Sequence, residues 1–120
     1  MAEAALFVGW GSMTDGREKR ALELFNKSMH YWRRLQEEGR IEGFDVAVLP
    51  PNDRDLRGFV LMRGTVQQID SLGDDEEFQR LFSDVQGVVD RVGVIDAFVD
   101  EALARTMRQY RDVGRIGELD

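Results

Sequence analysis

The hydrophobic pattern of the chain is organised around residues 56–65, LRGFVLMRGT. This stretch follows a polar break at 50–53. Its middle, 58–62, is apolar at both alternate positions, which is typical of a strand covered on both faces. We therefore predict a central strand here. Arg63 is the one charged residue between Gly58 and Gly64.

In the first half of the chain, the pattern predicts a strand, a long helix and a second strand. An apolar run at 4–11 is the first strand. Asp15 and Glu18 have the spacing of a helix N-cap and its N3 partner, so a helix is expected from there to about residue 38, ended by Gly39. Residues 41–49, closed by two prolines, form the second strand. The apolar face of the helix is expected to contain Ala21, Leu22, Leu24, Phe25, Ser28, Met29, Trp32 and Leu35.

In the second half, helix signals follow the central strand. Thr65 and Gln68 have capping-box spacing and predict a helix over 66–72, which Gly73 ends. Asp74 and Glu77 start a second helical piece from 75 to about 85. A fourth strand lies within 88–99, and an amphipathic helix follows over 100–112. The element order is therefore β-α-β-β-α-β plus a C-terminal helix.

This order matches the ferredoxin-like split βαβ motif. We predict an α+β protein with one ferredoxin-like domain over residues 1–120. Its four-stranded antiparallel sheet would carry helices on one face, with the first and third strands at the centre. We also predict that these two central strands run parallel to each other.

Composition narrows the function classes. The chain has 120 residues, a formal net charge of -7 and no cysteine. The acidic balance argues against nucleic-acid partners and against an anionic membrane surface. The lack of cysteine rules out disulfides, thiolate metal sites and a cysteine nucleophile. The N-terminal apolar run is too short for a signal peptide, so a cytoplasmic location is expected.

Four segments together carry a resemblance: ALFVGWG, RLQEEGRIEGFDVAVLPP, LRGFVLMRG and DEEFQRLF with VVDRVGVIDAFV. Their layout resembles the dimeric α/β-barrel superfamily, which includes YCII-related proteins and monooxygenases of the antibiotic-biosynthesis type. More closely, it resembles a family of small bacterial proteins of unknown function. The resemblance implies a homodimer in which the helix-free sheet faces meet. The alternative is that the last helix covers that face within one chain.

Arg63 and Asp96 are charges within apolar strands. In the predicted topology, Arg63 ends the third strand beside Trp10 at the end of the first, where two helices also begin. Such a corner would suit a carboxylate or phosphate group. The alternative is an internal ion pair of Arg63 with Asp15, Asp90 or Asp96, because buried charges are usually paired.

Aromatic residues offer a second candidate site. Trp10, Met29, Trp32 and Phe44 could line a pocket between helix and sheet, or could form plain core. His30, the only histidine, falls on the polar side of the first helix and is expected to be exposed. The histidine pattern of YCII-related proteins therefore cannot be carried over, and neither a haem nor a zinc site is predicted.

These features predict a dimeric α/β-barrel protein that binds a small anionic or aromatic molecule between helices and sheet. Trp10, Trp32, Arg63 and Asp96 are the predicted ligand-binding residues. No cofactor, metal or catalytic residue is assigned. The first alternative is a cofactor-independent monooxygenase or isomerase that uses Trp10, Tyr31 and Trp32 for shape and Arg63 to polarise an oxygen. The second alternative is a protein-interaction module.

Overall fold

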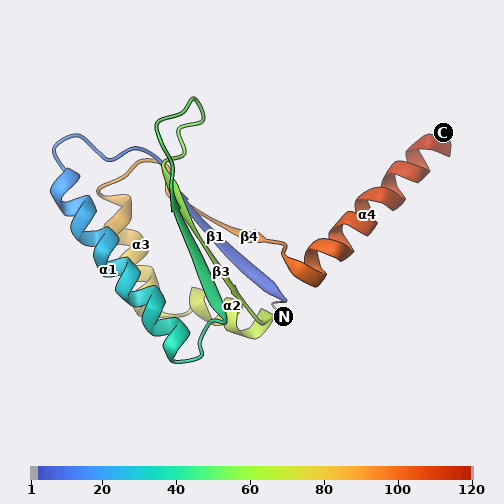
Figure 1. The fold of residues 1–120 in the computed structure, drawn as a ribbon, viewed down its shortest axis with the longest axis horizontal. Helices are drawn as coiled ribbons and strands as arrows, with labels where there is room; N and C mark the ends of the chain where they lie inside the picture. Colours follow the sequence, from blue (N-terminus) through green and yellow to red (C-terminus); the bar gives the residue numbers. More distant parts are fainter. Residues whose placement is uncertain (1–2, 120) are drawn as a thin grey trace.

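The computed structural model describes residues 3–119 (Figure 1). Its elements follow the predicted order, with the second helical region divided in two. In chain order they are β1 (Ala4–Trp10), α1 (Glu18–Glu37), β2 (Gly43–Val48), β3 (Gly58–Gly64), α2 (Val66–Gly73), α3 (Glu76–Gln86), β4 (Gly93–Ala97) and α4 (Asp100–Leu119). None of the helices among these residues is both long and apolar enough to cross a membrane.

The sheet has the order β2-β3-β1-β4, and every neighbouring pair is antiparallel. The ferredoxin-like fold and the central place of β1 and β3 are thus confirmed. The predicted parallel pairing of these two strands is wrong. Because β3 returns directly from β2 and inserts beside β1, it runs opposite to both of them. Ala4 therefore pairs with Gly64, and Trp10 pairs with Gly58.

The two faces of the sheet carry different neighbours. Leu6 of β1 and Val60 and Met62 of β3 belong to the main buried core with residues of α1, α2 and α3. The alternate positions, including Phe7 and Phe59, point to the other face, which carries no helix (Figure 1). We call this second surface the open face. Its apolar strand residues are Ala5, Phe7, Ala47, Phe59, Leu61, Ile95 and Ala97.

Helix α1 lies on the sheet through a buried stripe, but its details differ from the prediction. Asp15 does not cap it: the N-cap residue is Arg17, and no side chain makes a capping hydrogen bond. Leu22 is 57% exposed, whereas Tyr31 is buried. The apolar stripe is therefore rotated toward α3. His30 is exposed, as predicted.

Helices α2 and α3 begin at side-chain caps. Thr65 accepts a hydrogen bond from the backbone N–H of Gln68, and the Gln68 side chain accepts one from the backbone N–H of Thr65, so the predicted capping box is confirmed. At α3 the cap is Asp75 rather than Asp74, and it accepts from the backbone N–H of Glu77 at 3.0 Å. These caps satisfy N–H groups that have no partner within the helix.

Helix α4 extends away from the body of the molecule (Figure 1). Two residues separate it from β4, and it runs to Leu119, longer than the predicted 100–112. It does not lie over the open face, so the alternative in which the last helix covers that face within one chain is wrong for this structure.

Candidate functional site

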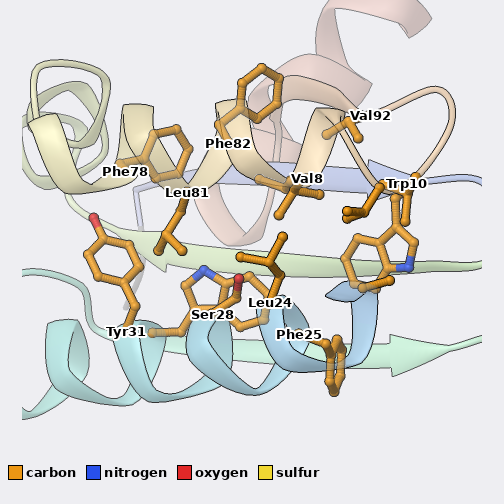
Figure 2. A pocket seen from close by; sticks show the side chains of 15 residues that line it. Val8, Trp10, Leu24, Phe25, Ser28, Tyr31, Phe78, Leu81, Phe82 and Val92 are labelled. Atoms are coloured by element: carbon orange, nitrogen blue, oxygen red, sulfur yellow. The ribbon is translucent and has the colours of Figure 1, made fainter. Parts of the chain in front are cut away.

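A pocket of about 80 Å³ lies between α1, α3 and the helix-covered face of the sheet (Figure 2). Tyr31 stands at one end and Trp10 at the other, with Leu24 and Val8 between them. The lining residues are mainly aliphatic or aromatic, and none is charged. They are Val8, Trp10, Ala21, Leu24, Phe25, Ser28, Tyr31, Trp32, Phe78, Leu81, Phe82, Val85, Val88, Val89 and Val92.

A few polar atoms interrupt this apolar lining. Ser28 is 5% exposed and contributes a hydroxyl from α1. This hydroxyl can both donate and accept a hydrogen bond, whereas the indole nitrogen of Trp10 lies on the side of its ring away from Leu24 and Val8 (Figure 2). The pocket can therefore offer hydrogen bonds to a ligand that is otherwise apolar, and it offers no charge to neutralise an anion.

Trp10 is positioned by its neighbours on both sides. A Cβ atom added to Gly58, its partner on β3, would come within 2.4 Å of the indole ring. Phe25 of α1 meets the same ring edge-on, with centroids 6.2 Å apart. The glycine thus makes the space that the indole occupies at this end of the pocket.

Trp32 lines the same pocket from the middle of α1 and is buried. Its ring lies 6.3 Å from that of Phe44 on β2. The structure therefore brings together Trp10 and Trp32, two of the four predicted site residues. Trp32 also belongs to the main core. It therefore lines a pocket and is part of the core, the two arrangements considered for it from the sequence.

Tyr31 closes its end of the pocket through a polar network that the sequence did not predict. Its hydroxyl donates to Asp75 at 2.8 Å, and Arg40 donates to the same carboxylate oxygen at 2.7 Å. Burial, followed by the hydrogen bond to Asp75, raises the pKa of Tyr31 above its ordinary value of 10.0. Burial also acts to raise the pKa of Asp75, but hydrogen bonds from Tyr31, Arg40 and Glu77 outweigh it and lower that pKa. The network ties α1 to the start of α3.

Arg63 lies far from this pocket. It pairs with Ala5 at the opposite end of β1 from Trp10, because β1 and β3 are antiparallel. The predicted positive corner of Arg63, Trp10 and two helix N-termini is therefore wrong. Arg63 instead forms an ion pair with Asp45 of β2, which was not among the three carboxylates considered as partners.

Asp96 is also separate from both Arg63 and the pocket. It pairs with Leu6, whose side chain is on the helix-covered face, whereas Arg63 pairs with Ala5 on the open face. The two charges thus belong to opposite faces of the sheet. Asp96 is exposed on the edge strand β4. Among the side chains that the structure describes, no three His, Asp or Glu residues converge on a possible metal site.

The chain matches no family model, and no curated protein matches it in sequence. Solved structures do resemble it. A protein from Arabidopsis thaliana has a TM-score of 0.62 at 13% identity, over 82% of this chain and 96% of the other. A dimeric ferredoxin-like protein of unknown function from Jannaschia sp. CCS1 has a TM-score of 0.61 at 14% identity, over 80% and 98%.

A variant of SnoaB, a cofactor-independent oxygenase from Streptomyces nogalater, is also similar. It has a TM-score of 0.56 at 11% identity, over 83% of this chain and 98% of the other. At these identities the likeness establishes the ferredoxin-like fold and nothing finer. The relation to YCII-related proteins stays a prediction.

Proposed function

We propose that this protein binds a small, neutral, mainly aromatic molecule in the pocket between α1, α3 and the sheet. The observation that carries the proposal is the lining itself: aromatic and aliphatic side chains with a few hydrogen-bonding groups and no charge. Small-molecule sites typically have this composition. Of the two ligand classes predicted from the sequence, the aromatic one is retained, because Arg63 does not contribute to the pocket.

The size of the pocket limits the ligand. Its volume of about 80 Å³ is well below the roughly 300–1,000 Å³ of sites for drug-sized molecules. A ligand with fused rings therefore requires the lining side chains to move apart. The Ser28 hydroxyl, which can donate and accept, would fix the orientation of a hydroxyl or carbonyl on the ligand.

A matched pair of probes tests the proposal: 2-naphthol and 2-naphthoate at pH 7, which share a ring system and differ in charge. We expect 2-naphthol to raise the melting temperature with increasing concentration, because a ligand that binds only the folded state stabilises it. The naphthoate should have little effect. Both tryptophans of the chain line the pocket, so their fluorescence gives a second measurement.

The variant Ala21→Leu narrows the pocket and should abolish the shift produced by 2-naphthol. Leu22→Ala, at the adjacent but exposed position of α1, is the matched control and should retain it. Equal responses to the alcohol and the acid, or an unchanged response in Ala21→Leu, would contradict binding in this pocket.

A cofactor-independent oxygenase is the second candidate. It is supported by the fold shared with SnoaB and by the aromatic rings of Trp10, Tyr31 and Trp32 that line the pocket. The geometry gives no role to Arg63, which lies on the other face of the sheet. In such an enzyme the aromatic substrate itself supplies the electrons that reduce O2. An oxygen electrode with hydroxyaromatic substrates tests it, and binding without O2 consumption would leave only the first proposal.

Homodimer formation through the open face is part of the proposed function. Phe7 and Phe59 stack on that face with centroids 5.3 Å apart, and Ile95 beside them is 60% exposed. Contiguous apolar surface of this kind is unusual on a soluble monomer and marks interaction sites. The structural relative from Jannaschia is itself described as dimeric.

A further inference from the structure

Helix α4 carries an apolar stripe that nothing in its own chain covers. Leu103, Met107 and Tyr110 recur at helical spacing, so they lie on one side of the helix. All three are exposed, Met107 at 54% and Tyr110 at 65%. Ala102 is the buried residue of the helix among those with described side chains. The helix therefore touches the body near its start and then projects with its stripe uncovered (Figure 1).

The stripe is continuous along the chain with the open face. Ile95 belongs to that face on β4, and the exposed Phe98 lies between it and the helix. Phenylalanine, methionine and tyrosine are enriched at protein interfaces, and charged residues are depleted from their centres. Helix α4 carries four arginines and four acidic residues in its sequence, so it has no net positive charge to attract an anionic membrane. The composition thus favours a protein partner.

The length of α4 is sufficient to reach a second copy packed on the open face. Two sheets that pack face to face lie about 10 Å apart. An α-helix rises 1.5 Å per residue, so the 20 residues of α4 span roughly 30 Å. Because α4 starts from an edge strand, it begins at the rim of the sheet, where a partner packed on the open face would lie within its length.

We propose that α4 is an arm that packs, through Leu103, Met107 and Tyr110, on the partner subunit beside the sheet-to-sheet interface. This inference rests on the dimer proposed above. It adds that each subunit covers part of the other with its last helix, so the interface extends beyond the open face.

Amide hydrogen exchange, followed by mass spectrometry on the full chain, tests the arm. We expect peptides of α4 to be protected in the dimer and to lose that protection on dilution to the monomer. Met107→Glu should weaken dimerisation about tenfold or more, because it places a charge at a packed contact. Gln109→Glu adds the same charge roughly 200° around the helix and is the matched control, expected to leave dimerisation unchanged.

The possible outcomes separate the two proposals. A dimer whose α4 exchanges freely, or whose affinity is the same in Met107→Glu and Gln109→Glu, would overturn the arm and leave the dimer standing. Protection of α4 that persists in the monomer would mean that it packs on its own chain, which also overturns the arm. A chain that is monomeric at all concentrations would remove both the arm and the dimer, while binding of 2-naphthol would still be measurable.

Discussion

The indole of Trp10 covers Gly58 on the neighbouring strand so closely that a methyl group there would lie 2.4 Å from the ring. Trp10 forms one end of the pocket, so this glycine controls the shape of the site from the opposite strand. The relationship depends on the antiparallel register, which places the last residue of β1 beside the first residue of β3.

Gly58→Ala is therefore expected to displace Trp10 and destabilise the fold by about 1–3 kcal/mol, as overpacking does. The fluorescence of Trp10 should change as well. Gly93→Ala on β4 is the matched control, because an added Cβ meets no atom within 4 Å there. Urea unfolding of both variants measures the difference. Equal stabilities would show that the ring moves without cost.

Tyr31→Phe is expected to cost about 1.5–3 kcal/mol near neutral pH, because it removes a partly buried hydrogen bond to a charged acceptor. Asp75 keeps its bonds from Arg40 and Glu77, so the helix cap should survive. Denaturant unfolding measures the loss. A cost near zero would mean that the hydroxyl is equally well satisfied in the unfolded chain.

The pH dependence of stability should distinguish Tyr31 from Asp75. The pKa of Tyr31 is raised in the folded state, so its contribution is present below the unfolded value of 10.0 and is lost as the pH rises above it. The pKa of Asp75 is lowered, so its contribution is present above the unfolded value of 3.8 and is lost as the pH falls below it. Tyr31→Phe should therefore reduce the loss of folding stability at alkaline pH, because the titrating phenol is removed. It should also reduce the loss at acid pH, because Asp75 no longer accepts a hydrogen bond from residue 31.

Two neighbouring positions on α1 should respond very differently to alanine. Trp32→Ala is expected to cost ~3–5 kcal/mol, because the side chain is buried in the main core. His30→Ala should cost under ~0.5 kcal/mol, because that side chain is exposed. Thermal or urea unfolding gives both values. A large loss at His30 would mean that it contacts a partner surface.

Leu61→Glu, on the open face, is expected to convert the dimer to a monomer, because the interface would have to bury an unpaired carboxylate. Sedimentation should give twice the chain mass of 13.8 kDa for the wild type and the mass of one chain for the variant. Leu22→Glu, on the exposed side of α1, is the matched control and should remain dimeric. A monomeric wild type would contradict the dimer.

Local signals in the sequence were sufficient for most of the fold. Capping at Thr65, the termination of α1 at Gly39 and the apolar strand at β3 all depend on residues within a few positions of one another. At Asp15 a local signal failed, because the spacing of a capping box does not ensure that the chain takes the backbone path that closes it. The short β4 lies within its predicted range, 88–99.

The candidate site could be predicted only in part. Trp10 and Trp32 were predicted from their residue type and spacing. Which residues lie beside the end of a strand depends on the direction of the neighbouring strand, and the predicted direction of β3 was wrong. An antiparallel pair put Arg63 beside Asp45 and away from Trp10. The hydrogen bond between Tyr31 and Asp75 joins positions 44 residues apart, and the sequence around neither residue indicates that the two are partners.

The strand order also places one acidic side chain on each outer strand, Asp45 on β2 and Asp96 on β4. Outer strands present backbone groups that can recruit another chain and seed aggregates. When β2 pairs antiparallel with β2 of another molecule, or β4 with β4, in one continuous sheet, the two carboxylates lie on the same face and repel each other. Asp96, which was predicted from the sequence as a ligand contact, thus acts together with Asp45 against uncontrolled growth of the sheet from its sides, while the open face stays available for a defined contact.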